Sequence, residues 1–165
     1  SRLGIEGPYG VVTLHRPANV DDPISVERLV EGLRRASKYV DLVAPLHPRG
    51  RESLEAAGLG EVAMILDPMG YIDFLALMSG ASIVLTDSGG IQEETTVLGI
   101  PCLTLRENTE RPVTITMGTN RLVGTDPDAI EAGLADMDSA RDAELPPLWD
   151  GHAGDRIARI LLAVG

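Results

Sequence analysis

The sequence predicts an α/β fold with a parallel β-sheet, and three observations support this prediction. Short apolar segments alternate with amphipathic segments along most of the 165 residues. Some apolar segments are nearly continuous, as at residues 81–85, which is typical of strands buried on both faces of a parallel sheet. Polar residues with reactive side chains follow several of these segments, where ligands bind in such sheets. We therefore expect helices on both sides of one sheet.

The elements follow from the local pattern, in chain order. Apolar, β-branched runs predict strands at residues 9–14, 41–45, 62–66, 83–86, 101–104 and 121–123. Asp22-Pro23 marks the start of a helix with apolar positions at Ile24, Leu29, Val30 and Leu33. Further helices are expected near residues 49–57, 71–79, 91–98 and 126–137. An irregular, Pro-interrupted link at 140–149 and an amphipathic helix at 155–164 complete the chain.

Composition narrows the class of protein. A 44% hydrophobic content in 165 residues is enough for one domain with a full core. The net charge of −11 argues against nucleic-acid or anionic-membrane partners, so an anionic ligand must be held by local donors. Cys102 is the single cysteine, and no secretory or membrane-length apolar run appears, so a cytoplasmic location is expected. The chain begins with Ser rather than Met, which fits a piece of a longer protein or a tag remnant.

The segment 85–95, Leu-Thr-Asp-Ser-Gly-Gly-Ile-Gln-Glu-Glu-Thr, joins a strand to a helix through Ser88, Gly89 and Gly90. The glycines are expected to allow a sharp turn and to expose N–H groups at the helix N-terminus, which favours a phosphate. A simple turn with a serine cap is the alternative. Glu93 and Glu94 are expected in the first helical turn, where one stabilises the helix dipole and the other can accept hydrogen bonds from ribose hydroxyls.

Two histidines follow strands. His15 and Arg16 end the first strand, where they can meet a diphosphate or assist proton transfer; a histidine bonded to a loop carbonyl is the alternative. His47 lies between prolines and is expected to cap a helix; contact with a ligand is the alternative. With no His-x-x-x-His or Cys-x-x-Cys spacing, no protein-held metal is predicted.

Aromatic and basic residues near the Ser-Gly-Gly turn leave alternatives open. Ile72, Leu75 and Met78 are expected to face the core, whereas Tyr71 and Phe74 either stack on a nucleotide base or pack normally. The loop that follows the strand at 101–104 carries Arg106 and Arg111. Either arginine could neutralise phosphates at the turn, and pairing of Arg111 with Glu107 or Glu110 is the alternative.

Four motifs in order resemble one known family. They are Leu85-Thr-Asp-Ser-Gly-Gly-Ile-Gln-Glu-Glu, Gly99-Ile-Pro-Cys-Leu, Arg106-Glu-Asn-Thr-Glu-Arg-Pro and Gly118-Thr-Asn-Arg-Leu-Val-Gly-Thr. From about residue 11 to 160 the chain resembles the carboxyl-terminal half of the non-hydrolysing UDP-N-acetylglucosamine 2-epimerases. The resemblance implies a Rossmann-like three-layer domain at residues 1–165, one half of a two-domain GT-B fold whose amino-terminal domain is absent.

The resemblance also implies an activity and its residues. Ser88, Gly89 and Gly90 would hold the UDP diphosphate, Glu94 the ribose hydroxyls, and Arg111 a phosphate. Phe74 would lie near the uracil, and His15 would be the active-site histidine. UDP-GlcNAc and UDP-ManNAc would interconvert by elimination of UDP to 2-acetamidoglucal and re-addition, without a cofactor. The full-length enzyme would be a homodimer that supplies ManNAc units to a surface polysaccharide.

Two departures from the family pattern limit this reading. Many bacterial members have His-Arg-Arg-Glu-Asn where this chain has His15-Arg16-Pro-Ala-Asn, and Ala18 cannot supply the glutamate of an activating UDP-sugar site. The frequent Asn-Pro-Tyr-Gly-Asp-Gly is reduced to Asp150-Gly151. Because the proton-moving carboxylates belong to the other domain, we expect the isolated chain to be inactive. The competing functions are a GT-B glycosyltransferase domain and a non-enzymatic sugar-nucleotide sensor.

Overall fold

A computed structural model describes residues 5, 7–136 and 144–164. Its strands are β1 (Tyr9–Thr13), β2 (Asp41–Pro45), β3 (Ala63–Leu66), β4 (Ile83–Thr86), β5 (Cys102–Thr104) and β6 (Asn120–Leu122). They form one six-stranded sheet in the order β3-β2-β1-β4-β5-β6, and every neighbouring pair is parallel. This is the strand order of a Rossmann-like sheet, which confirms the predicted fold class.

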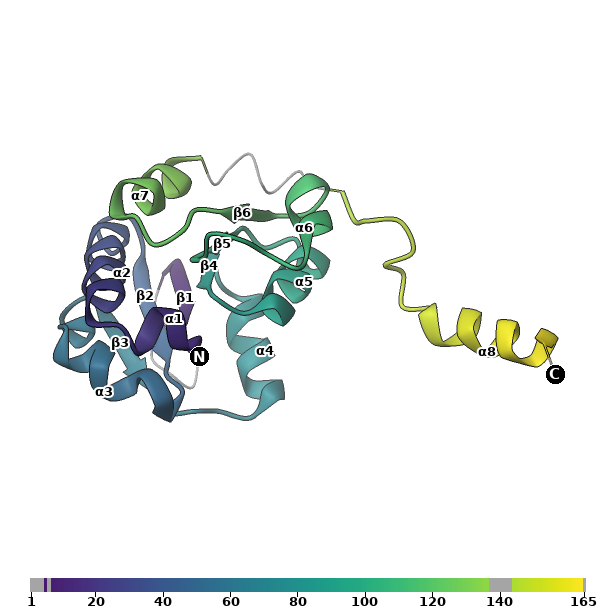
Figure 1. Ribbon diagram of the computed structural model, residues 1–165, viewed down its shortest axis with the longest axis horizontal. Helices are drawn as coiled ribbons and strands as arrows, with labels where there is room; N and C mark the ends of the chain where they lie inside the picture. Colours follow the sequence, from purple (N-terminus) through teal and green to yellow (C-terminus); the bar gives the residue numbers. More distant parts are fainter. Residues whose placement is uncertain (1–4, 6, 137–143, 165) are drawn as a thin grey trace.

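Helices cover both faces of the sheet (Figure 1). On one side lie α1 (Pro17–Val20), α2 (Pro23–Ala36), α3 (Pro48–Ala56) and α7 (Pro127–Ala135); on the other lie α4 (Tyr71–Ser79), α5 (Gly89–Leu98) and α6 (Pro112–Thr116). A 3₁₀ turn, η1 (Leu59–Glu61), precedes β3. The structure therefore has the three expected layers.

Alternating strand residues build a separate core on each face. Val12 belongs to a core cluster that includes residues of α2, α3 and α7, whereas its neighbour Val11 belongs to one that includes residues of α4, and both valines are fully buried. This alternation explains why the central strands are apolar at nearly every position. The expected core face of α4 is confirmed at Met78, which is fully buried, but it is wrong at Ile72, which is 73% exposed; Leu77 is buried instead.

Proline and a capping side chain start several helices where the sequence predicts. Asp22 accepts a hydrogen bond from Ser25 N (2.9 Å) ahead of Pro23, and Asp126 accepts from Asp128 N (2.9 Å) ahead of Pro127. Helix α7 was expected from residue 126 to 137. In the structure its cap is Asp126 and its last helical residue is Ala135, and residue 137 lies outside the described residues.

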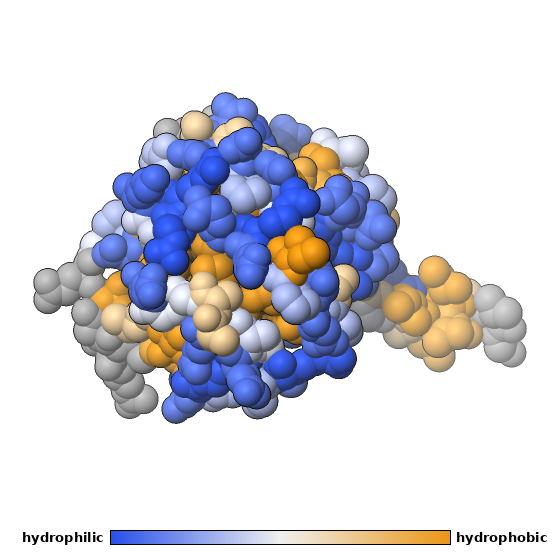
Figure 2. All heavy atoms as spheres, turned by 60° about the vertical axis from the view of Figure 1, so that its left-hand side comes forward, coloured by the Kyte–Doolittle hydropathy of each residue, from blue (hydrophilic) through white to orange (hydrophobic). Residues whose placement is uncertain are grey.

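The last helix, α8 (Ala153–Val164), projects away from the three layers (Figure 1). It begins two residues before the predicted start, after Asp150 accepts a hydrogen bond from His152 N (3.1 Å). Ile157, Ile160, Leu161 and Leu162 are exposed on it. Figure 2 shows apolar side chains on the segment that projects to the right of the molecule. Of the predicted link, residues 140–143 lie outside the described residues. Within the described part of the chain, no helix is long and apolar enough to cross a membrane.

Candidate functional site

The candidate site lies where the order of strands reverses. β1 and β4 are neighbours in the sheet although their paired positions are 73 residues apart in the sequence, and the chain leaves them toward opposite flanks. Their last residues, Thr13 and Thr86, are paired, and the two hydroxyl oxygens are 2.7 Å apart. Loops that follow such neighbouring strands diverge and leave a crevice at the carboxyl ends of the strands. His15 follows one of these strands and Ser88 follows the other.

Asp87 joins the two loops. This fully buried carboxylate accepts hydrogen bonds from His15 N (3.1 Å), Arg16 N (2.9 Å) and Asn19 Nδ2 (3.2 Å). The Asn19 amide also donates to Leu105 O (2.9 Å), so the exit of β5 is tied to the same point. Our sequence reasoning did not identify Asp87. An acidic residue directly after a buried strand was the signal that could have found it, because a buried carboxylate needs several donors.

The imidazole of His15 also lies against Asp87. His15 Nδ1 is 2.9 Å from Asp87 Oδ1, and the His15 side chain is 48% exposed. The alternative in which this ring bonds to a loop carbonyl is therefore not what the structure shows. His15 has one ring nitrogen oriented by a buried carboxylate and a ring that reaches solvent, which is the arrangement of a histidine that can exchange protons.

Two arginines and one glutamate gather over the turn between β4 and α5. Arg106 makes two hydrogen bonds to the Glu110 carboxylate (3.0 and 2.9 Å), and Arg16 Nη2 lies 3.6 Å from it. Arg16 Nε also donates to Asp87 O (3.1 Å). The hydrogen bonds from Arg106 are the main cause that lowers the pKa of Glu110 to about 2. Two guanidinium groups and two carboxylates, those of Glu110 and Asp87, therefore meet beside this turn.

The Ser-Gly-Gly turn differs from the prediction in one respect. Ser88 is the N-cap of α5, but Gly89 and Gly90 are ordinary helical residues without positive φ, so the sharp turn does not require glycine. Ser88 N donates to Thr86 Oγ1 (3.0 Å), and the Ser88 hydroxyl makes no capping bond. A Cβ atom at Gly89 would have its nearest neighbour, Glu110 Oε2, at 3.8 Å. The glycines thus leave the N-terminus of α5 bare and open to an anion.

Glu93 and Glu94 lie in the second turn of α5, not the first, because the helix begins at Gly89. Glu94 Oε1 accepts a hydrogen bond from Tyr71 OH (3.1 Å), and this bond raises the pKa of the Tyr71 phenol. Glu93 Oε1 lies 2.7 Å from Arg111 Nε. Arg111 therefore pairs with Glu93 and not with Glu107 or the Glu110 side chain, as the alternative had it.

These side chains border a hollow of about 470 Å³ between α4 and α5. Its walls are both polar and apolar, and its lining residues are Tyr71, Leu75, Glu93, Glu94, Val97, Leu98 and Trp149. Phe74 is half-buried and packs against the core beneath α4, so ordinary packing describes it in this structure. Tyr71, which is exposed, is the aromatic residue that meets the carboxylate of Glu94. The hollow combines an aromatic wall with an oxygen acceptor, which suits a nucleoside.

A buried polar network supports the loop that carries Arg111. Gln92 Oε1 accepts hydrogen bonds from Thr109 Oγ1 (2.6 Å) and Asn120 Nδ2 (3.2 Å). Thr109 Oγ1 in turn accepts from Arg111 N (3.0 Å), and Thr114 Oγ1 donates to Arg111 O (2.7 Å). Gln92 is fully buried in α5. The network fixes the loop of Arg111 to the same helix whose N-terminus faces the crevice.

The structure does not bring His47 into this group. His47 is the N-cap of α3, and its Nδ1 accepts a hydrogen bond from Arg49 N (3.2 Å), so the capping alternative is confirmed. In the part of the chain that the structure describes, no group of three or more His, Cys, Asp or Glu side chains could hold a metal ion.

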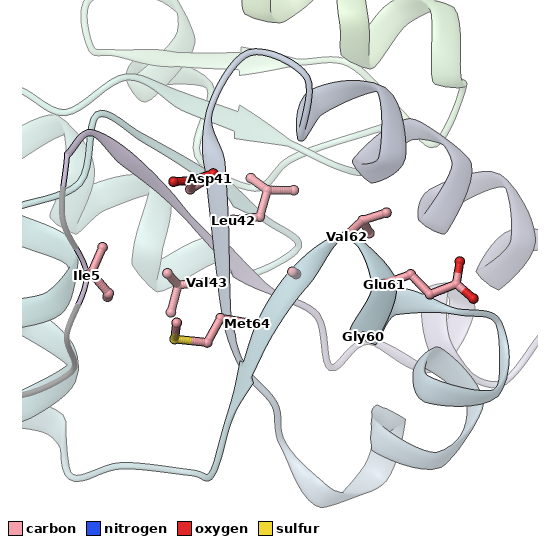
Figure 3. A pocket seen from close by; sticks show the side chains of 9 residues that line it. Ile5, Asp41, Leu42, Val43, Gly60, Glu61, Val62 and Met64 are labelled. Carbon is pink, nitrogen blue, oxygen red and sulfur yellow. The ribbon is translucent and has the colours of Figure 1, made fainter.

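A second hollow, of about 560 Å³, lies at the other end of the sheet (Figure 3). Asp41 and Ala63, which begin β2 and β3, are among its lining residues, and Figure 3 shows Ile5, Val43 and Met64 turned toward one another there. The amino-terminal ends of parallel strands are not where open α/β sheets bind their ligands. The crevice beside α5 is therefore the better candidate.

Comparisons with known proteins agree on one family. The family model described as UDP-N-acetylglucosamine 2-epimerase matches residues 3–162. UDP-N-acetylglucosamine 2-epimerase of Methanocaldococcus jannaschii is 37% identical over 95% of this chain and 45% of its own length. UDP-2,3-diacetamido-2,3-dideoxy-D-glucuronate 2-epimerase of Pseudomonas aeruginosa is 37% identical over 98% of this chain and 47% of its own length.

A solved structure gives the same result. The crystal structure of the Methanocaldococcus jannaschii UDP-GlcNAc 2-epimerase in complex with UDP-GlcNAc and UDP superposes with a TM-score of 0.84 at 36% identity. The match covers 94% of this chain and 45% of the crystallised one. The chain thus spans about half the length of the curated relatives that it matches.

Proposed function

This chain belongs to the UDP-N-acetylglucosamine 2-epimerase family, and from that premise we propose that it is the UDP-binding, carboxyl-terminal half of such an enzyme. The observation that carries the proposal is the convergence of His15, Arg16 and the Ser88 turn on Asp87, beside the bare N-terminus of α5. This convergence lies at the point of the sheet where α/β proteins bind nucleotides. The reaction we propose is interconversion of UDP-GlcNAc and UDP-ManNAc, by elimination of UDP to 2-acetamidoglucal and re-addition of UDP, with no cofactor.

The diphosphate is proposed to bind at the N-terminus of α5. Ser88, Gly89 and Gly90 would supply the hydroxyl and the N–H donors, and nothing within 3.8 Å of either glycine's missing Cβ obstructs a close approach. Arg16 and Arg106 place two guanidinium groups beside this turn, and Glu110 pairs with both of them. These guanidinium groups are local donors that could hold an anion in a chain whose net charge is −11.

The nucleoside is proposed to occupy the hollow between α4 and α5. Glu94 would accept hydrogen bonds from the ribose hydroxyls in place of the bond from Tyr71 OH. Phe74, which packs beneath α4 beside this hollow, would lie near the uracil. Arg111 would contact a phosphate by exchanging its Glu93 partner, 2.7 Å away, for a phosphate oxygen. Such an exchange keeps the guanidinium paired in both states and leaves Glu93, whose side chain is 41% exposed, to water.

The active-site role proposed for His15 is on the sugar side of the diphosphate. The carboxylates that move the C2 proton would come from the amino-terminal domain, so the isolated chain would bind UDP without turning over UDP-GlcNAc. The coverage of about 45% of the relatives supports this division. The Pseudomonas aeruginosa relative is named for a different sugar, which supports the view that this half reads the UDP and the other half reads the sugar. The whole enzyme is proposed to be a cytoplasmic homodimer.

Calorimetric titration of the chain with UDP tests the proposal. We expect binding in the wild type and a loss of about 10-fold to 100-fold in Arg111→Ala, the range for a charge-assisted hydrogen bond to phosphate. Ser88→Ala should also weaken binding. The matched controls are Arg34→Ala and Ser79→Ala, which remove the same side-chain types at exposed positions at the ends of α2 and α4, away from the crevice.

Turnover of UDP-GlcNAc is followed by NMR in the same samples. Binding without formation of UDP-ManNAc is the expected result. Epimerisation by the 165 residues alone would contradict the division of labour between the two halves. Equal weakening in Arg34→Ala and Arg111→Ala would show that the arginine effect is one of net charge and that the phosphate is wrongly placed.

A further inference from the structure

The two oxygens of Asp87 have different partners. Oδ2 lies within hydrogen-bonding distance of all three loop donors, namely His15 N (3.1 Å), Arg16 N (2.9 Å) and Asn19 Nδ2 (3.2 Å). Oδ1 faces the imidazole, 2.9 Å from His15 Nδ1, and has only one longer contact with the loop, to His15 N at 3.2 Å. One oxygen is therefore enough to hold the loop, as an asparagine could do. The second oxygen serves the imidazole.

A carboxylate in this position selects one form of the imidazole. An ionised carboxylate only accepts hydrogen bonds, so the short contact requires a hydrogen on His15 Nδ1. In a neutral imidazole the lone pair is then on Nε2, and Nε2 becomes the nitrogen that can take a proton. Asp87 is fully buried, so water does not reach the carboxylate side of this contact.

We propose that Asp87 is a positioning residue for His15, which it holds in the Nδ1–H tautomer so that Nε2 is presented to the ligand beside α5. The identity of that ligand rests on the proposed function, whereas the tautomer of His15 is inferred only from the contacts between His15 and Asp87. Asp87 itself is buried behind the loop and acts only through the histidine. A role in loop stability alone would leave the tautomer of His15 undetermined, and this difference can be measured.

The test uses the full 165-residue chain labelled with ¹⁵N, at a pH where titration shows all three imidazoles to be neutral. Two-bond ¹H–¹⁵N correlations then give the tautomer of each ring. We expect Nδ1–H for His15. His47 is an internal reference of the opposite kind, because its Nδ1 accepts a hydrogen bond from Arg49 N and so must lack the hydrogen. An Nε2–H tautomer for His15 in the wild type would overturn the proposal without any variant.

Asp87→Asn tests whether the second oxygen sets the tautomer. The amide oxygen can take the place of Oδ2 and keep the three loop donors satisfied, while the amide nitrogen faces His15 Nδ1 and can only donate to it. We expect the ratio of tautomers to change by at least about tenfold toward Nε2–H, since the same change beside a catalytic histidine in hydrolases gives the wrong tautomer with the geometry intact. An unchanged Nδ1–H tautomer in this variant would overturn the proposal.

Asn19→Ala is the control for a purely structural effect. It removes one loop donor and the bond to Leu105 O but leaves Asp87 facing the imidazole. We expect His15 to stay in the Nδ1–H tautomer in Asn19→Ala. This variant still tests the proposal if Asp87→Asn does not fold. A change to the Nε2–H tautomer in Asn19→Ala would mean that loop packing sets the tautomer, and it would contradict the proposal. UDP titration of the same wild-type sample separates the two ideas: the expected tautomer without UDP binding would refute the proposed function and leave the positioning of His15 standing.

Discussion

Two glycines at opposite ends of α5, Gly90 in its first turn and Gly99 at its C-cap, should separate the requirements of folding from those of ligand binding. Gly90 lies in the first turn with a helical backbone, and the nearest atom to its missing Cβ is Ser88 Oγ at 4.0 Å. Gly99 is the C-cap of the same helix, with φ 68° and ψ 26°, and nothing lies within 4 Å of its missing Cβ. Both sites have space for a methyl group. Only Gly99 has a backbone conformation that alanine disfavours.

The magnitudes follow from these backbone angles. Alanine is more favourable than glycine inside a helix by up to about 1 kcal/mol, so Gly90→Ala should raise the free energy of unfolding by about 0.5 kcal/mol in the less ordered first turn. Gly99→Ala should lower it by about 1 to 2 kcal/mol, the cost of the left-handed conformation. If the diphosphate approaches the backbone of α5, the methyl of Gly90→Ala obstructs it. UDP binding should then weaken at least about tenfold, or about 1.4 kcal/mol.

Urea unfolding gives the stability of both variants, and calorimetric titration gives their affinity for UDP. Gly90→Ala should be at least as stable as the wild type but bind UDP weakly, and Gly99→Ala should be less stable but bind UDP with affinity changed less than about twofold. Wild-type affinity in Gly90→Ala would falsify the placement of the phosphates at this turn. A large loss of stability in Gly90→Ala would instead show that the glycine serves the fold.

Three further predictions concern buried and charged groups. Gln92→Leu leaves the Thr109 hydroxyl and a second buried donor without their acceptor, so it should lower the free energy of unfolding by about 2 to 4 kcal/mol in urea and weaken UDP binding through the Arg111 loop. The Glu110 carboxyl should titrate near pH 2 by NMR, and Arg106→Gln should return the midpoint to the ordinary range. Because the folded-state pKa is below the unfolded value, the stabilising contribution of Glu110 is complete above about pH 5 and is lost as pH falls toward 2. Burial raises the pKa of the Cys102 thiol to about 12, so it should react with iodoacetamide only after urea unfolds the chain, and rapid labelling of the native protein would contradict its burial.

Most of the fold could be predicted because apolar runs and Asp-Pro helix starts are local signals. The strand expected at residues 41–45 is β2 as observed, and 83–86 is β4. Ile72 was wrongly placed in the core. Periodicity gives the residues that share a face, but Ile72 is the second residue of α4, and its first-turn position leaves it 73% exposed. Where a helix begins relative to the sheet is a property of the tertiary structure.

The candidate site was predicted in its residue types more than in its contacts. The expected position of Ser88 before a helix is confirmed, and so is the cap made by His47. The partner of Arg111 was wrong, because Glu93 is 18 positions away and on another element, whereas the sequence drew attention to neighbouring glutamates. The sequence also could not show that Asp87 pairs with His15 across 72 residues. The roles assigned to Phe74, Glu94 and Arg111 stay predictions, as does the cytoplasmic location.

The position of the crevice has a consequence for how this chain folds. His15 comes from the unit β1-α2-β2-α3-β3, and Asp87 and Ser88 come from the unit that begins with β4, so neither unit contains the site by itself. Contacts between segments so distant in sequence form only after the loop between them is closed, which slows their formation. A ligand bound there stabilises only the state in which the two units have docked. Recovery of UDP binding during refolding would therefore time the docking of the two halves of the sheet, a step that backbone spectroscopy of the separate helices cannot resolve.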